Sequence, residues 1–179
     1  MKTLSALFFL SLGVLLSGCC KKDTTPQPLN QLPATTQEGK NTFGCLLNGQ
    51  AWTPKGYNGT SNYTVFYDPE YANGTLNIST YSYPDKDEKD KQTITLFSDN
   101  LSKVGTYPLT IINQQEALFS DRKTKCYFLQ GESHFRDGIL TITRLDLNKG
   151  IISGTFEFTL AKPGCDTIRV TNGRFDKKL

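Results

Sequence analysis

Few side chains in this sequence are of the kinds that enzymes use for catalysis. His134 is the only histidine among the 179 residues, so a Ser-His-Asp arrangement would have to be built around it. The nearest approach to a nucleophile elbow is the stretch Gly150-Ile-Ile-Ser153-Gly, which is one residue out from the required spacing. Ser153 also falls inside a predicted strand and not on a strand-to-helix turn. The sequence therefore argues against a serine hydrolase.

Two polar stretches could be read as metal sites. Glu132, His134 and Asp137 lie within six residues, but a catalytic zinc site usually takes two or three histidines. Residues 85–91 alternate acidic residues with lysines and lack the glycine of a calcium loop. We interpret both stretches as solvated hairpin loops. The chain has no Gly-rich phosphate loop either, so we expect no metal and no cofactor.

One aromatic cluster is suggestive. Six of the eight tyrosines fall between positions 57 and 83, directly after the single tryptophan. Tyrosines on a sheet face can stack on sugars or line the mouth of a ligand site. Tyrosine is also favoured on half-buried strands, so a purely structural role stays open. The candidate ligand contacts are Trp52, Tyr57, Tyr63, Tyr67, Tyr71, Tyr81 and Tyr83.

The N-terminus has the features of a secretory leader. A short basic start precedes an apolar stretch, residues 4–16, that is too short to span a bilayer as a helix. The following Leu16-Ser17-Gly18-Cys19 resembles the lipobox of bacterial lipoproteins. That resemblance implies removal of residues 1–18 and acylation of Cys19, which would attach the chain stably to a membrane. Aspartate does not follow Cys19, and Lys-Lys-Asp stands where surface lipoproteins carry an acidic cluster. We therefore expect the outer membrane, on its periplasmic face.

Beyond the leader, the chain divides into a tether and one domain. Residues 19–41 comprise Cys19 and a segment rich in Pro, Thr and Gln without aromatics, which predicts a flexible spacer. Residues 42–179 contain short alternating apolar runs separated by Asn-Gly and Pro turns. This pattern predicts a single all-β domain of about eight to ten strands, arranged as an antiparallel sandwich or a barrel. Lys and Arg exceed Asp and Glu by 20 to 17, which argues against nucleic-acid binding through strong positive charge.

Three cysteines belong to this exported domain, where a disulfide would form and persist. Cys45 alternates with Phe43 and Leu47 and should point into the core. Cys126 begins a strand, and Cys165 follows a Pro-Gly turn near the same C-terminal strands. We favour a Cys126–Cys165 bridge with Cys45 free, although the other two pairings stay open on sequence alone.

Several motifs together are similar to a family of uncharacterised lipoproteins from Bacteroidetes. They are Asn-Thr-Phe-Gly-Cys-Leu-Leu-Asn-Gly-Gln-Ala-Trp, which ends at Trp52, together with residues 151–158 (Ile-Ile-Ser-Gly-Thr-Phe-Glu-Phe) and 166–176 (Asp-Thr-Ile-Arg-Val-Thr-Asn-Gly-Arg-Phe-Asp). The resemblance implies a lipid-anchored all-β domain of unknown function and brings no catalytic residues with it. Asp-Thr pairs at Thr24 and Thr167 also resemble an O-glycosylation signal of this bacterial group.

These observations favour a non-enzymatic binding or interaction module in the cell envelope. Its expected partners are the membrane, through the acyl chains, and a glycan or an envelope protein. A glycan-active hydrolase that uses carboxylates alone is the first alternative, because its two carboxylates need not be close in sequence. A purely structural envelope protein is the second.

The first prediction concerns the anchor. Growth with a fatty-acid analogue should label the wild-type protein and the Cys20→Ala variant. Cys19→Ala should lose the label, because it removes the acceptor thiol. Label that persists in Cys19→Ala would overturn the assignment of the lipobox.

Overall fold

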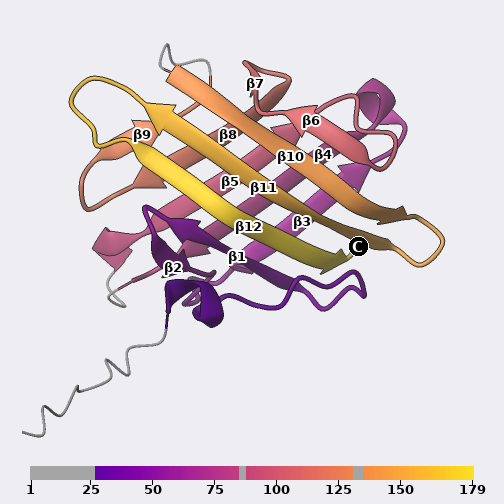
Figure 1. Ribbon diagram of the computed structural model, residues 1–179, viewed down its shortest axis with the longest axis horizontal. Helices are drawn as coiled ribbons and strands as arrows, with labels where there is room; N and C mark the ends of the chain where they lie inside the picture. The colour runs from indigo at the N-terminus through magenta and orange to yellow at the C-terminus, as the bar shows by residue number, and fades with distance from the viewer. Residues whose placement is uncertain (1–26, 85–87, 131–134) are drawn as a thin grey trace, which may run out of the picture.

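The computed structural model describes residues 27–84, 88–130 and 135–179, and they form two antiparallel sheets packed as a sandwich (Figure 1). The front sheet has the order β2-β1-β12-β11-β10-β6. Its strands are β1 (Thr42–Leu47), β2 (Gln50–Trp52), β6 (Gly105–Pro108), β10 (Phe135–Asp146), β11 (Ile151–Ala161) and β12 (Ile168–Lys178). The long strands β10, β11 and β12 dominate this sheet.

The back sheet has the order β3-β4-β5-β8-β7, with β9 also paired to β8. Its strands are β3 (Tyr63–Asp68), β4 (Thr75–Ser82), β5 (Gln92–Ser98), β7 (Thr110–Ile111), β8 (Gln115–Asp121) and β9 (Cys126–Phe128). Three short 3-10 helices complete the described elements: η1 (Pro28–Gln31), η2 (Tyr71–Asn73) and η3 (Glu88–Asp90).

The predicted all-β class and the sandwich are confirmed, and the barrel alternative is wrong because the two sheets do not close on each other. The described residues form twelve strands where about eight to ten were expected. The strands β2, β7 and β9 have only two or three residues each, too few to show an alternating pattern. The Asn48-Gly49 pair makes the expected hairpin turn between β1 and β2, since both residues have positive φ (48° and 80°).

The core lies between the sheets and follows the alternation of the strands. Its inward side chains are almost fully buried and come from both sheets: Leu76, Ile78, Ile94, Leu96, Leu140, Ile142, Ile152, Leu160, Phe128 and Phe175. Burying an apolar side chain of this size contributes about 1.5–3 kcal/mol relative to leaving it exposed. Among the described residues, no helix is long and apolar enough to cross a bilayer.

A buried ion pair joins the two sheets. The Arg136 guanidinium in β10 lies 3.0 Å from the Glu116 carboxylate in β8, and the two side chains are 3% and 1% exposed. Arg136 also donates hydrogen bonds to the carbonyls of Ala117 and Leu129. Because removing one member would leave a buried charge without its counterion, the pair fixes β10 against the back sheet.

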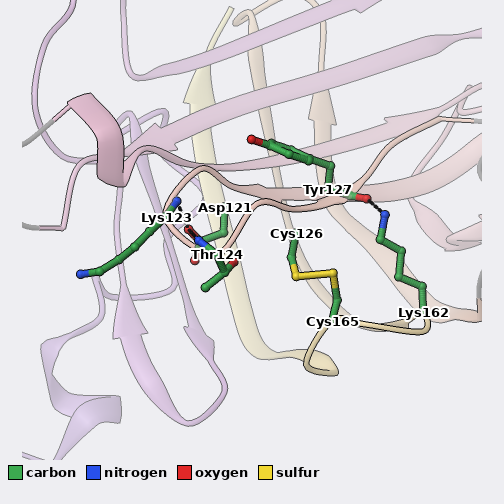
Figure 2. Close-up of a disulfide and its surroundings, with 7 residues drawn as sticks. All are labelled: Asp121, Lys123, Thr124, Cys126, Tyr127, Lys162 and Cys165. Carbon is green, nitrogen blue, oxygen red and sulfur yellow. Dashed lines mark hydrogen bonds between the residues drawn. A yellow bond between two sulfur atoms is a disulfide. The ribbon is translucent and has the colours of Figure 1, made fainter.

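A disulfide joins Cys126 to Cys165, with a Cα–Cα distance of 5.7 Å, while Cys45 is free and buried (Figure 2). This is the pairing that the sequence favoured. The bridge ties β9 of the back sheet to the loop that precedes β12 of the front sheet. Beside it, the Lys162 ammonium donates a hydrogen bond to the carbonyl of Tyr127. Burial raises the pKa of the Cys45 thiol to about 12, so this thiol stays protonated and unreactive.

The second prediction concerns these sulfurs. Non-reducing peptide mapping should find the Cys126 and Cys165 peptides linked, and a thiol reagent should modify Cys45 only after unfolding. Replacing both bridged cysteines with alanine should lower the free energy of unfolding by about 3–4 kcal/mol, because the bridge closes a loop with a sequence separation of 39. A peptide containing Cys45 linked to either partner would contradict the pairing.

Candidate functional site

The structure corrects the expectation of an aromatic ligand surface. Four of the seven candidate rings are buried, with exposed fractions of 5–6%: Trp52, Tyr63, Tyr81 and Tyr83. Tyr67 is half-buried. Only Tyr57 and Tyr71 are well exposed, and they lie in the segments before and after β3, so they do not form one surface.

Three of these aromatics also use their polar ends within the chain, whereas the Tyr63 hydroxyl is buried without a hydrogen-bond partner among the described residues. The Trp52 indole N–H donates to the Gln92 side-chain oxygen at 3.0 Å. The Tyr81 hydroxyl donates to the Thr60 carbonyl at 2.6 Å, and the Tyr67 hydroxyl to the Leu101 carbonyl at 2.8 Å. Trp52 does line a hollow of about 520 Å³ beside β2, but no tyrosine joins it there. These rings therefore hold the domain together.

A more promising surface lies on the outer face of the front sheet. Two adjoining hollows of about 380 and 290 Å³ share Ile139, Glu157 and Thr171, and together they form a groove across β10, β11 and β12. We call this surface the groove. The larger hollow is lined by Thr35, Ile139, Thr141, Thr155, Phe156, Glu157, Thr171, Asn172, Gly173 and Arg174. The smaller hollow adds Asp137, Gly138, Phe158, Thr159 and Val170.

Strand register places the polar side chains of the groove in rows. Thr141 of β10 lies opposite Thr155 of β11, which lies opposite Arg174 of β12. Four residues away along β10, a second row runs from Asp137 through Thr159 to Arg169. Because side chains directly opposite on one sheet face are close neighbours, each row presents polar groups side by side.

The middle of the groove contains Glu157 and a bulge in β12. Ile139 lies opposite Glu157, while Thr171 and Asn172 both oppose Glu157, between the pairs Phe156–Gly173 and Phe158–Val170. Asn172 has a φ of 52°, a conformation that asparagine tolerates better than most residues. The Asn172-Gly173 pair, expected from the sequence to make a bend, therefore makes a bulge within a strand. A bulge beside a hollow re-aims the side chains around it.

The groove offers groups for hydrogen bonding that are not already engaged. In the part of the chain that the structure describes, the carboxylates of Asp137 and Glu157 have no hydrogen-bond or ion-pair partner. Phe135 is 58% exposed and occupies the next outward position of β10 beyond Asp137, while Ile139 is 42% exposed. The groove thus combines carboxylates, threonine hydroxyls, an arginine and exposed apolar surface.

An N-terminal segment, residues 32–41, borders the larger hollow through Thr35, and we call this segment the strap. The sequence assigned this segment to the flexible tether, but the structure packs it on the outer face of the front sheet. The strap is held by the carboxylate of Asp176 in β12, a residue that is 1% exposed. That carboxylate accepts hydrogen bonds from the Thr36 hydroxyl at 2.6 Å and from the backbone N–H groups of Glu38, Gly39 and Lys40 at 2.8–3.0 Å.

The front sheet contributes further contacts to the strap. Arg144 donates to the Gln37 carbonyl, and Arg174 donates to the Pro33 carbonyl at 3.3 Å. Within the sheet, the Ser153 hydroxyl also donates to Asp176 at 2.7 Å. Burial by itself raises the pKa of the Asp176 carboxyl, but the hydrogen bonds it accepts outweigh burial and hold that pKa well below its usual range. Asp176 is therefore ionised at neutral pH while the strap is docked.

The remaining candidate residues are the expected lipidation and glycosylation sites. Thr167 is exposed, two residues beyond the bridged Cys165, so its hydroxyl is accessible to modification. Cys19 and Thr24 lie outside the described residues. Within the described ranges, no three His, Cys, Asp or Glu side chains gather closely enough to hold a metal ion.

Sequence reasoning missed the groove and the strap. The groove depends on the register of three strands and on the bulge at Asn172, neither of which leaves a simple pattern. The one available signal was the alternation of Thr155, Glu157 and Thr159 with the apolar residues of β11, which marks an outward polar row.

Comparison with protein families gives one match. The model of a domain of unknown function (DUF6252) matches residues 43–177, which span all twelve strands except for the first residue of β1 and the last of β12. Comparisons with curated proteins and with solved structures give no match.

The third prediction concerns Asp176. Asp176→Asn should lower the free energy of unfolding by about 2–3 kcal/mol at pH 7, because it weakens several hydrogen bonds to a charged acceptor. The folded-state pKa of Asp176 lies below the unfolded value of about 3.9, so the stabilisation is present above that pH and is lost as the pH falls toward the folded pKa. Denaturant titrations at several pH values should therefore show the gap between wild type and variant narrowing below about pH 4. A gap that does not change with pH would contradict the prediction.

Proposed function

We propose a function for this chain, which belongs to the DUF6252 family of domains of unknown function: it is a non-enzymatic binding module of the cell envelope that holds a glycan in the groove. The observation that carries the proposal is the groove itself, where polar groups from three strands converge and the carboxylates of Asp137 and Glu157 have no partner among the residues that the structure describes. Sites that orient a ligand commonly combine apolar surface with a few convergent polar groups.

The chemistry of the groove fits a neutral, hydroxyl-rich ligand. Threonine hydroxyls and carboxylates can accept hydrogen bonds from sugar hydroxyls, and the exposed Phe135 and Ile139 offer apolar surface to the C–H faces of a ring. The lining of the two hollows contains two carboxylates (Asp137, Glu157) and one guanidinium group (Arg174), while Arg169 stands at the end of the second row, outside that lining. A surface without an excess of positive charge does not recruit a polyanion.

The anchor completes the proposal. The lipobox-like Leu16-Ser17-Gly18-Cys19 supports acylation of Cys19 and retention at the outer membrane. The absence of an acidic cluster after Cys19 favours the periplasmic face. An envelope protein as the partner of the groove, and a purely structural role with no small ligand, remain the rival interpretations that the binding experiment addresses.

One observation supports a second candidate function, a glycan hydrolase. Asp137 and Glu157 lie diagonally on neighbouring strands of the same face, because Asp137 opposes Thr159 and Glu157 opposes Ile139. Diagonal neighbours on a sheet are about 7–8 Å apart, and inverting glycosidases hold their two carboxyl groups about 6.5–9.5 Å apart. Both carboxylates are exposed, which fits simple binding better than acid catalysis from a desolvated pocket.

The fourth prediction tests the groove. The full-length protein, purified in detergent, should bind neutral oligosaccharides on a glycan array, and Glu157→Gln should weaken that binding about tenfold or more, the usual cost of losing a hydrogen bond to a charged group. Glu70→Gln is the matched control, because Glu70 is also exposed but lies beyond the end of β3, outside both hollows.

The same preparation separates the rivals. Equal binding by wild type and Glu157→Gln would remove the groove as the site, and no binding by wild type would overturn the glycan proposal. Release of shortened oligosaccharides, abolished by Asp137→Asn or by Glu157→Gln, would establish the hydrolase instead.

A further inference from the structure

We infer that the strap and the groove form one coupled unit, in which a bound glycan stabilises the docked strap and undocking of the strap weakens glycan binding. The inference rests on the proposed function of the groove and concerns how that site is regulated.

The strap contributes directly to the ligand site. Thr35 lines the larger hollow together with Thr155 and Arg174. Arg174 contacts both parts, since its Nη1 donates to the Pro33 carbonyl and its Nε donates to the Asn172 carbonyl at 3.1 Å. A ligand in the larger hollow therefore meets the strap on one side and the β12 bulge on the other. When the strap leaves, the ligand loses one wall and Arg174 loses a partner that holds it in place.

The strap is the part of the domain that is most easily released. Leu32 is its only buried side chain, at 9% exposed, and the rest of the strap is half-buried or exposed. Most of its attachment is polar and converges on the single carboxylate of Asp176. Segments with few buried apolar contacts open with much smaller free energies than the core. The strap can therefore undock while the two sheets stay folded.

The docked state is nevertheless well defined. Gly39 has a φ of 74°, which lets its N–H point at Asp176, and a Cβ at this position would lie 3.3 Å from the Cβ of Lys178. A ligand that binds only the docked state shifts the equilibrium toward docking, and docking raises the affinity for the ligand by the same factor.

The strap also lies between the proposed anchor and the first strand of the domain. Its ten residues, once undocked, add up to about 35 Å of extended chain between membrane and domain. Glycan binding, which favours the docked strap, would therefore shorten the free chain between the membrane and the domain. A mechanical force along that chain would act on the hydrogen bonds to Asp176 before it acted on the core. The groove and the anchor are linked through the strap.

The fifth prediction uses the full-length protein in detergent, with a mixture of neutral cello-, malto-, xylo- and chito-oligosaccharides as the probe. Hydrogen exchange followed by mass spectrometry should show the amides of Glu38, Gly39 and Lys40 exchanging about tenfold more slowly when sugar is bound. Asp176→Asn should accelerate exchange of these amides without sugar and should weaken sugar binding about tenfold. Thr36→Val, which removes one strap hydrogen bond and leaves β12 unchanged, should show the same effects to a smaller extent.

Asp121→Asn is the matched control. Asp121 is also a buried carboxylate that accepts backbone N–H groups, from Lys123 and Thr124, but it lies in the back sheet at the β8–β9 turn. This variant should leave strap exchange and sugar binding unchanged. Equal sugar affinity in wild type and Asp176→Asn, with strap exchange accelerated in the variant, would overturn the coupling and leave the proposed function standing. Failure of the wild-type protein to bind any of these sugars would overturn the proposed function, and the coupling with it.

Discussion

The outer face of the front sheet is organised around one buried charge, the carboxylate of Asp176. Five hydrogen bonds reach it, four from the strap and one from Ser153 of β11. A carboxylate that stayed buried without such donors would be strongly destabilising, so the strap that covers Asp176 must also supply its hydrogen-bond donors. The same contacts fix the position of the strap, and the strap forms the boundary between the covered part of the outer face and the groove.

The bulge in β12 meets a second constraint. The strand must point Ile168 and Val170 into the core near one end, and Phe175 into the core near the other. These positions are out of phase by one residue, and the extra residue at Thr171-Asn172 restores the phase. Gly173 is needed directly after it, because a Cβ there would lie 2.5 Å from ring atoms of Phe156. The groove is thus a by-product of packing that leaves Glu157 facing two residues of the neighbouring strand.

Local patterns in the sequence were enough for the all-β class and the inward position of Cys45, and they favoured the pairing of Cys126 with Cys165 without excluding the other two pairings. The strap was out of reach, because its amides bind a carboxylate 136–138 residues away and carry no periodicity of their own. The tyrosine cluster misled for a related reason. Composition shows that Tyr63 and Tyr81 belong to strands, but only the packing of the sheets shows that their rings are buried.

A shallow polar groove on a sheet face is expected to bind a sugar weakly. Each hydrogen bond to a sugar replaces one to water, so its net contribution is only about 0.5–1.5 kcal/mol, and association entropy opposes the sum. A single groove of this kind therefore binds weakly. On the proposed lipid anchor, many copies would share one membrane surface facing a polymeric ligand, and a second contact would then form at a high effective concentration. When weak sites act together in this way, each single contact can dissociate while the set of proteins stays bound to the polymer. This suits an envelope-binding module better than an enzyme, which must bind one substrate tightly enough to orient it.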